Sequence, residues 1–129
     1  MNEEGDVARI LVVDDESEIR RFLNRVITAL GHEVVEAPDG QTGLNRFQDE
    51  TIDLSFVDIN MPGMNGITFL EEVKIIDPQA IVVIMTGYPS ADTIMKTVED
   101  DGYTYITKPF QVEQIKDLVH RGLAAHGIA

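Results

Sequence analysis

The chain has 129 residues, of which 23 are acidic and 10 basic, so its formal net charge is −13 at pH 7. This charge argues against sequence-independent nucleic-acid binding and against an anionic membrane surface as a partner, because both need a cationic face. The absence of cysteine excludes disulfides and thiolate metal sites, and no apolar run approaches the ~20 residues of a membrane span. Hydrophobic residues make up 43%, which suits one globular domain, and the acidic N-terminus is no targeting peptide, so we expect a cytoplasmic protein.

The N-terminal part of the chain predicts a buried strand followed by an amphipathic helix. A β-branched apolar run at residues 8–13 ends in Asp14 and Asp15, which is typical of a strand in a parallel sheet. The apolar residues that follow recur with helical spacing; Asp15 or Ser17 can cap the start of this helix, and Gly31 fits its end. The apolar stripe consists of Ile19, Phe22, Leu23, Val26, Ile27 and Leu30.

A second strand and helix and then a third strand follow. Residues 33–37 predict a short strand, and residues 41–49 predict a weaker helix. Gly43 lies inside that helix, where glycine costs ~1 kcal/mol relative to alanine, so we expect the helix to be loose. Residues 52–57 predict the third strand, which contains Ser55. If both faces of the sheet are covered, the Ser55 hydroxyl must bond to backbone.

The second half of the chain repeats this alternation. Apolar residues at helical spacing predict a third helix that stops before Pro78, a fourth helix that ends near residues 101–102, and a last helix. Apolar runs at residues 80–85 and 103–107 predict the fourth and fifth strands. The helical stripes are Ile67, Leu70, Val73 and Ile76; Ala91, Ile94, Met95 and Val98; and Val112, Ile115, Leu118 and Val119.

Five strands alternating with five helices predict a single α/β domain over residues 8–125, with short tails at residues 1–7 and 126–129. Near-continuous apolar strands imply a parallel sheet covered on both faces, and right-handed crossovers place the carboxyl ends of all strands on one edge. We expect the site at that edge, near the switch in strand order.

Four of the five predicted strands end in chemically capable side chains. These are Asp14 and Asp15 after the first strand, Asp58 after the third, Thr86 after the fourth and Lys108 after the fifth. Three crowded carboxylates repel one another, which a divalent cation relieves, and oxygen ligands alone favour Mg²⁺ or Mn²⁺. Lys108 suggests that an anion also visits this edge. A carboxylate, Mg²⁺ and a lysine around one point suit phosphoryl transfer to the carboxylate.

Other interpretations of these residues stay open at this point. Taken singly, Asp14 and Asp15 can cap a helix, Asp58 can shape a turn, and Thr86 can be a plain strand-end residue. An aspartate-nucleophile, Mg²⁺-dependent phosphohydrolase shares the chemistry, but it needs a DxD motif and a cap for which the chain has no spare length. A flavodoxin-like cofactor binder needs a Gly/Ser/Thr-rich phosphate loop, and DDESE is the electrostatic opposite of such a loop.

Four motifs stand in order at the ends of four predicted strands: LVVDDE, VDINMPGMNG, TGY and YITKPF. Together they resemble the receiver (CheY-like) domain of two-component response regulators, and the similarity covers almost the whole chain. The resemblance implies a flavodoxin-like doubly wound sheet with strand order 2-1-3-4-5. It also implies a signalling module that is no enzyme beyond its own phosphorylation and dephosphorylation.

The resemblance also implies roles for individual residues around the acidic cluster. Asp58 is expected to be the phosphoacceptor. Asp15, Asp58 and the backbone carbonyl of Asn60 are expected to bind Mg²⁺ directly, with Asp14 acting through a bound water. Mn²⁺ is also compatible with these oxygen ligands.

A second set of expected roles concerns the response to phosphorylation. Lys108 is expected to pair with the phosphoryl oxygens, Thr86 to be the switch hydroxyl, and Tyr105 to be the coupled switch aromatic. The Lys108–Pro109 peptide is expected to be cis, which is far less costly before proline than elsewhere. The surface of the fourth helix, fifth strand and fifth helix is expected to change and to dock a partner.

The partners implied are a sensor histidine kinase or a histidine phosphotransfer protein as donor, and a downstream protein or output domain as target. A phosphorylation-dependent homodimer is also compatible with the family. The segments TGYPSADT and YTYITKPF are similar to receivers attached to ATPase-type transcription activators. The chain either stands alone or belongs to a longer regulator.

Some residues depart from the usual pattern or lie outside the motifs. Gly43 stands where the family often has alanine, Asn65 replaces a frequent aspartate, and Asp101-Gly102 replaces a frequent Gly-Ala, so we expect the second and fourth helices to be less rigid. Met61 and Met64 are expected to pack within their loop. The three histidines, His32, His120 and His126, show no ligand spacing and are expected at the surface without a companion.

Overall fold

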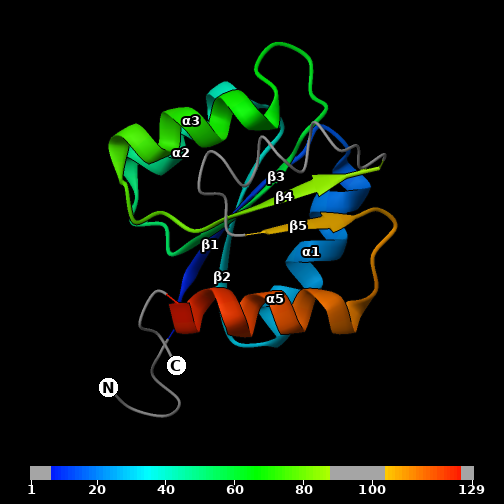
Figure 1. Ribbon diagram of the computed structural model, residues 1–129. Helices are drawn as coiled ribbons and strands as arrows, with labels where there is room; N and C mark the ends of the chain where they lie inside the picture. The colour runs from blue at the N-terminus through cyan, green and yellow to red at the C-terminus, as the bar shows by residue number, and fades with distance from the viewer. Residues whose placement is uncertain (1–6, 88–103, 126–129) are drawn as a thin grey trace.

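The computed structural model describes residues 7–87 and 104–125, which form a parallel sheet with helices on both faces (Figure 1). The five strands are ordered β2-β1-β3-β4-β5, which confirms the predicted fold class and strand order. The strands are β1 (Arg9–Val13), β2 (Glu33–Ala37), β3 (Leu54–Asp58), β4 (Val82–Thr86) and β5 (Thr104–Thr107).

Helices α1 and α5 cover one face of the sheet, and α2 and α3 cover the other (Figure 1). Their bounds are α1 (Ser17–Ala29), α2 (Gly40–Asp49), α3 (Gly66–Ile76) and α5 (Val112–Ala125). The helix predicted around residues 91–98 lies outside the described residues, as do both predicted tails apart from Val7. None of the described helices is long and apolar enough to cross a membrane.

The central strands are buried on both faces, and their side chains alternate between two apolar layers. Val13 and Val57 belong to the layer under α2 and α3, whereas Val12 and Phe56 belong to the layer under α1 and α5. Burying a side chain of this size contributes roughly 1.5–3 kcal/mol, so the two layers supply the main driving force for folding. This double burial explains why the strands read as continuous apolar runs.

The start of α1 differs from the prediction. The N-cap residue is Glu16, and its side chain makes no capping hydrogen bond. Neither Asp15 nor Ser17 caps the helix, so that expectation was wrong; instead Oδ1 of the buried Asp14 accepts the Glu16 N–H at 2.8 Å. The predicted end is confirmed, because Gly31 has a φ of 95°, in the left-handed region that favours glycine.

Side chains cap the two helices on the other face. The Asp39 carboxylate accepts the Thr42 N–H at 2.7 Å at the start of α2, and the Asn65 side chain accepts the Thr68 N–H at 2.9 Å at the start of α3. Asn65 therefore does the work of an N-cap residue. On α3 the predicted apolar stripe holds for Leu70 and Val73, but Ile76 is 42% exposed and does not belong to the core.

Close packing requires a glycine at position 43, although glycine lowers the helix propensity of α2. A Cβ at this buried position would lie 2.7 Å from Cγ2 of Val13 and 3.2 Å from Cε1 of Phe69. The glycine therefore lets α2 approach β1 and α3 closely, at the expense of helix propensity. The predicted looseness of α2 stays a prediction.

The expectation that the histidines lie at the surface without a companion was wrong for His32. Its Nδ1 accepts the Ala8 N–H at 3.0 Å, and the side chain is half-buried. Partial burial and then the nearby His120 lower the pKa of His32. His120 is exposed, and His126 lies outside the described residues.

Ser55 contradicts the expected backbone hydrogen bond. Its side chain is buried in the middle of β3, with 1% of its surface exposed, and Oγ has no hydrogen-bond partner within the described part of the chain. A buried hydroxyl without a partner costs free energy, because its hydrogen bonds to water are lost and not replaced.

We therefore expect Ser55→Ala to raise the free energy of unfolding by about 1 kcal/mol, since it removes an unsatisfied group and keeps a small side chain. Denaturant unfolding measures this change, with Ser17→Ala at the exposed start of α1 as the matched control. A loss of stability in Ser55→Ala would show that the hydroxyl has a partner after all.

Candidate functional site

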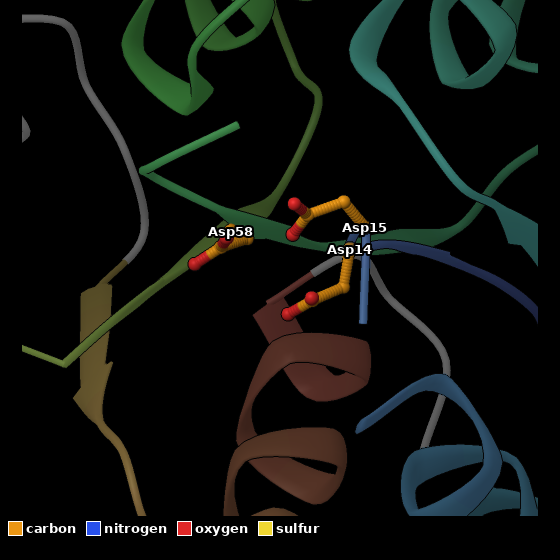
Figure 2. Close-up of side chains that lie close together, drawn as sticks. All are labelled: Asp14, Asp15 and Asp58. Atoms are coloured by element: carbon orange, nitrogen blue, oxygen red, sulfur yellow. The ribbon is translucent and has the colours of Figure 1, made fainter. Parts of the chain in front are cut away.

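Three carboxylates lie together at the carboxyl edge of the sheet, as Figure 2 shows. Each of Asp14, Asp15 and Asp58 offers an oxygen atom, and these atoms all lie within 4.8 Å of one another. The register of β1 and β3 pairs Val13 with Val57, so the two strands end level with each other. Asp14 and Asp58 are 0% and 5% exposed, whereas Asp15 is exposed.

The strand alternation aims the two buried acids to the same side. Val12 and Phe56 face the layer under α1 and α5, and Asp14 and Asp58 lie two residues further along their strands. Ile106 of β5 faces the same layer, and Lys108 lies two residues beyond it. The ends of β1, β3 and β5 therefore direct Asp14, Asp58 and Lys108 to the same side of the sheet.

Lys108 lies at the centre of this convergence. Its Nζ lies 2.9 Å from Asp14 Oδ2, 3.1 Å from Asp58 Oδ1 and 3.3 Å from Glu16 Oε1. The backbone N–H of Lys108 donates to the Thr86 carbonyl at 2.7 Å, which ties this segment to the end of β4. The Lys108–Pro109 peptide is cis, as predicted.

Glu16 is a site residue that sequence reasoning missed. The motif LVVDDE contains Glu16, but no role was predicted for it. Its position directly after Asp15 could have indicated that it lies at the site. Arg20 was missed as well. Its Nη1 donates to the Asp14 carbonyl at 2.7 Å and its Nε pairs with Glu36 at 3.1 Å, so α1 and β2 hold the acidic loop in place.

Burial and mutual repulsion shape the protonation of the buried acids. Burial, followed by the charge of Asp14, raises the pKa of Asp58, and Lys108 opposes the rise. Burial also raises the pKa of Asp14, although the hydrogen bond from Lys108 lowers it. Burial lowers the pKa of Lys108, but the hydrogen bond to Asp14 and the charges of Asp14 and Asp58 outweigh it, so the net shift is upward.

The loop after Asp58 is shaped by close backbone approach at Gly66. The Gly66 N–H donates to the Ile59 carbonyl at 3.0 Å, and a Cβ at this glycine would lie 2.6 Å from the backbone oxygen of Asp58. Only glycine allows α3 to begin so close to the acid. Met61 is buried and Met64 packs over Gly40, which confirms that both methionines pack within the fold.

An open hollow of about 370 Å³ lies over the cluster. Asn60 is exposed at its rim. The lining residues are Asp15, Glu16, Asp58, Asn60, Gly87 and Lys108. The hollow therefore gives a small anion access to Asp58 and Lys108 together.

The two predicted switch residues lie on the other face of the sheet. Thr86 ends β4 and is 1% exposed; it lies two residues after Ile84, which faces the layer under α2 and α3. Tyr105 is partly buried and packs against that same layer, opposite Ile84 in the β4–β5 register. The structure thus brings Asp14, Asp15, Asp58 and Lys108 together, and places Thr86 and Tyr105 on the opposite face of the sheet, in β4 and β5.

The donor set suits a hard divalent cation. All candidate ligands are oxygen atoms, and three carboxylates face a single ammonium. Burial raises the pKa values of Asp14 and Asp58, so holding both as carboxylates beside Asp15 is costly without a further positive charge. A cation such as Mg²⁺ relieves this excess, and Asp15 at the exposed rim gives it a route of entry.

Comparisons with known proteins all indicate the same protein family. Residues 10–120 match the family model of the response regulator receiver domain. The chain is 37% identical over 115 residues to sporulation initiation phosphotransferase F of Bacillus subtilis, covering 89% of this chain and 93% of that protein. It is 34% identical over 117 residues to the regulatory protein AtoC of Escherichia coli, covering 91% of this chain but only 25% of that protein.

Solved structures agree with the sequence relatives. A receiver domain protein (CheY-like) from Methanospirillum hungatei superposes with a TM-score of 0.90 at 26% identity, covering 94% of this chain and 97% of that one. The likeness in fold thus extends over nearly all of this chain.

The raised pKa of Asp58 predicts how stability depends on pH in the metal-free protein. Because the folded state holds this proton more tightly than the unfolded state, the contribution of Asp58 to the free energy of unfolding falls as pH rises from the ordinary value of 3.8 through the raised folded value. At neutral pH the carboxylate therefore destabilises the fold. Asp58→Asn should be more stable than wild type at pH 7, and this advantage should shrink toward pH 4.

Denaturant unfolding in the presence of a chelator, at several pH values, measures this difference. Asp49→Asn, which removes an exposed carboxylate at the end of α2, is the matched control and should show no comparable trend. An Asp58→Asn advantage that is absent or grows toward low pH would contradict the prediction.

Proposed function

Because this chain belongs to the response regulator receiver family, we propose that Asp58 is its phosphoacceptor and that Lys108 orients the incoming phosphoryl group. The chain is a receiver domain of two-component signal transduction with an acidic pocket, and it is no enzyme beyond its own phosphorylation and dephosphorylation. We assign this unit to residues 8–125. The observation that carries the proposal is Lys108 Nζ between Asp14 and Asp58, at 2.9 and 3.1 Å, beneath an open hollow.

The carboxylate of Asp58 is suited to act as the nucleophile. It is fixed at the end of a buried strand, and its side chain is 7% exposed, so its oxygen atoms have few water molecules to displace. An attacking oxygen of Asp58 would form the bond to phosphorus as the bond to the leaving group breaks, which produces an acyl phosphate. Lys108 would stay beside the transferred oxygens, because it already lies within ion-pair distance of Asp58.

We propose Mg²⁺ as the metal at the acidic cluster, with Mn²⁺ as a substitute. Asp15, Asp58 and the backbone carbonyl of Asn60 would hold it directly, and Asp14 through a water. When bound, the ion supplies neutralisation of the charge on the phosphoryl oxygens and on the carboxylates. The support for this set is the joint placement of the three acids and the position of Asn60 in the lining of the same hollow.

Phosphorylation would be communicated across the sheet through Thr86 and Tyr105. Both belong to the face under α2 and α3, adjacent to the edge where Asp58 lies. A phosphoryl group on Asp58 would draw the Thr86 hydroxyl toward it and favour an inward position of Tyr105. The result is a shift between two states that phosphate stabilises unequally, which is the requirement for a switch.

The membership of the receiver family implies the kinds of partner that the chain meets. Two-component receivers take their phosphoryl group from a histidine kinase or a phosphotransferase. We propose that the donor is a phosphohistidine, and that the surface around β5 and α5 passes the signal to a downstream protein or output domain. The AtoC relative, of which the chain spans 25%, supports an attached output domain; the phosphotransferase relative, of which it spans 93%, supports a stand-alone relay protein.

With Mg²⁺ and acetyl phosphate, wild type should gain one phosphoryl group, and Asp58→Asn should gain none, because an amide is not a nucleophile for phosphorus under these conditions. Intact-mass spectrometry in acid-free buffer measures the label. Asp49→Asn is the matched control, since it removes an exposed carboxylate far from the cluster and should be labelled as wild type is. Equal labelling of Asp58→Asn, or labelling of wild type without a divalent cation, would overturn the proposal.

A further inference from the structure

Glu16 is a carboxylate of the site to which the proposed function gives no role. It follows Asp15 directly and lines the same hollow as Asp58 and Lys108. Its side chain is 63% exposed, and its Oε1 lies 3.3 Å from Lys108 Nζ. All three carboxylates are held by Lys108, but Glu16 remains largely in water, whereas Asp14 and Asp58 are buried.

The ammonium of Lys108 lies among three carboxylates of this chain. An ammonium group has three protons to donate, and three carboxylates lie within ion-pair distance of Nζ: Asp14 at 2.9 Å, Asp58 at 3.1 Å and Glu16 at 3.3 Å. Its hydrogen bonds go to Asp14 and Glu16, so an incoming phosphoryl oxygen competes with these two carboxylates for the protons of Lys108.

Of the three, Glu16 is the carboxylate that leaves most easily. Asp14 is 0% exposed and also accepts the Glu16 N–H, and Asp58 is the group to be phosphorylated. Glu16 needs only a side-chain rotation into solvent. Its side chain makes no capping hydrogen bond at the start of α1, so no such bond opposes the movement.

We infer that Glu16 competes with the phosphoryl donor for Lys108 and thereby slows phosphorylation of Asp58, more strongly for donors of higher negative charge. The inference rests on the proposed function, because it concerns the rate at which Asp58 is modified. Two effects act together: the donor must displace the Glu16 carboxylate from Lys108, and the displaced carboxylate still repels an anion within the hollow.

Two small phosphoryl donors of different net charge distinguish an effect of Glu16 on the charge of the donor from a general effect on the reactivity of Asp58. With acetyl phosphate, a dianion, an Asp58 oxygen bonds to phosphorus while the P–O bond breaks, and acetate leaves with the electron pair. With phosphoramidate, which carries its proton on nitrogen and is a monoanion near neutral pH, the same oxygen attacks while the P–N bond breaks, and ammonia leaves. Neither reaction needs a further co-reactant. Because the leaving groups differ, the rate of each variant is divided by the wild-type rate with the same donor, and the two ratios then differ through the charge that approaches Glu16.

The experiment compares Glu16→Gln with wild type and with Glu18→Gln, a matched removal of an exposed carboxylate from the first turn of α1. Phosphorylation rate constants are measured at saturating Mg²⁺ for each variant. We expect Glu16→Gln to raise the rate constant of phosphorylation about fivefold with acetyl phosphate and about twofold with phosphoramidate. The effect is larger with acetyl phosphate because the lost charge of Glu16 repels a dianion more strongly than a monoanion. Glu18→Gln should match wild type with both donors.

A second readout needs neither metal nor donor. In the metal-free protein, the side-chain ¹⁵N resonance of Lys108 should shift in Glu16→Gln and not in Glu18→Gln, because only the first variant removes a charged partner of Nζ. An unchanged resonance, or equal acceleration of both donors, would overturn the inference while leaving the proposed function intact. A wild type that neither donor labels would overturn the proposed function itself, and this inference with it.

Discussion

The carboxyl edge of this sheet holds more negative charge than its single ammonium can neutralise, and the structure of the site depends on that imbalance. Lys108 is shared among Asp14, Asp58 and Glu16, and Asp15 adds a further carboxylate within reach of the first two. Burial makes the imbalance costly, because buried carboxylates lose the water that would stabilise their charge. A divalent cation would relieve it, whereas an acyl phosphate on Asp58 would carry more negative charge than the carboxylate and so increase the need for a cation.

The fold places the acidic cluster at the edge of the sheet, where both faces of the sheet are within reach. Parallel strands of matched register end level with one another, so side chains distant in sequence meet at one edge. Asp14, Asp58 and Lys108 continue the face under α1 and α5, whereas Thr86 and Tyr105 continue the opposite face. A change of charge at Asp58 therefore occurs where the two faces of the sheet meet. Arg20 donates a hydrogen bond to the Asp14 carbonyl and so anchors the acidic loop.

Sequence patterns predicted what depends on periodicity and on strand ends, and missed what depends on contacts between elements. Strand order, the acid cluster and the cis peptide agree with the structure. The end of α1 was predictable because Gly31 has an intrinsic preference for positive φ; its start was not, because the carboxylate that accepts the Glu16 amide, Asp14, lies outside the usual capping position. The close contact of Gly43 with Val13 and the isolation of the Ser55 hydroxyl depend on three-dimensional packing, which no local pattern encodes.

Titration calorimetry of Mg²⁺ binding to wild type and to Asp15→Asn tests the charge imbalance most directly. Asp15 is exposed and makes no hydrogen bond through its side chain and no ion pair within residues 7–87 and 104–125, so its replacement leaves the contacts of Lys108 in place. We predict a single site in wild type and at least about tenfold weaker binding in Asp15→Asn, as expected when a direct carboxylate ligand is lost. No binding to wild type, or equal affinity in the two proteins, would contradict the central role of the acidic cluster.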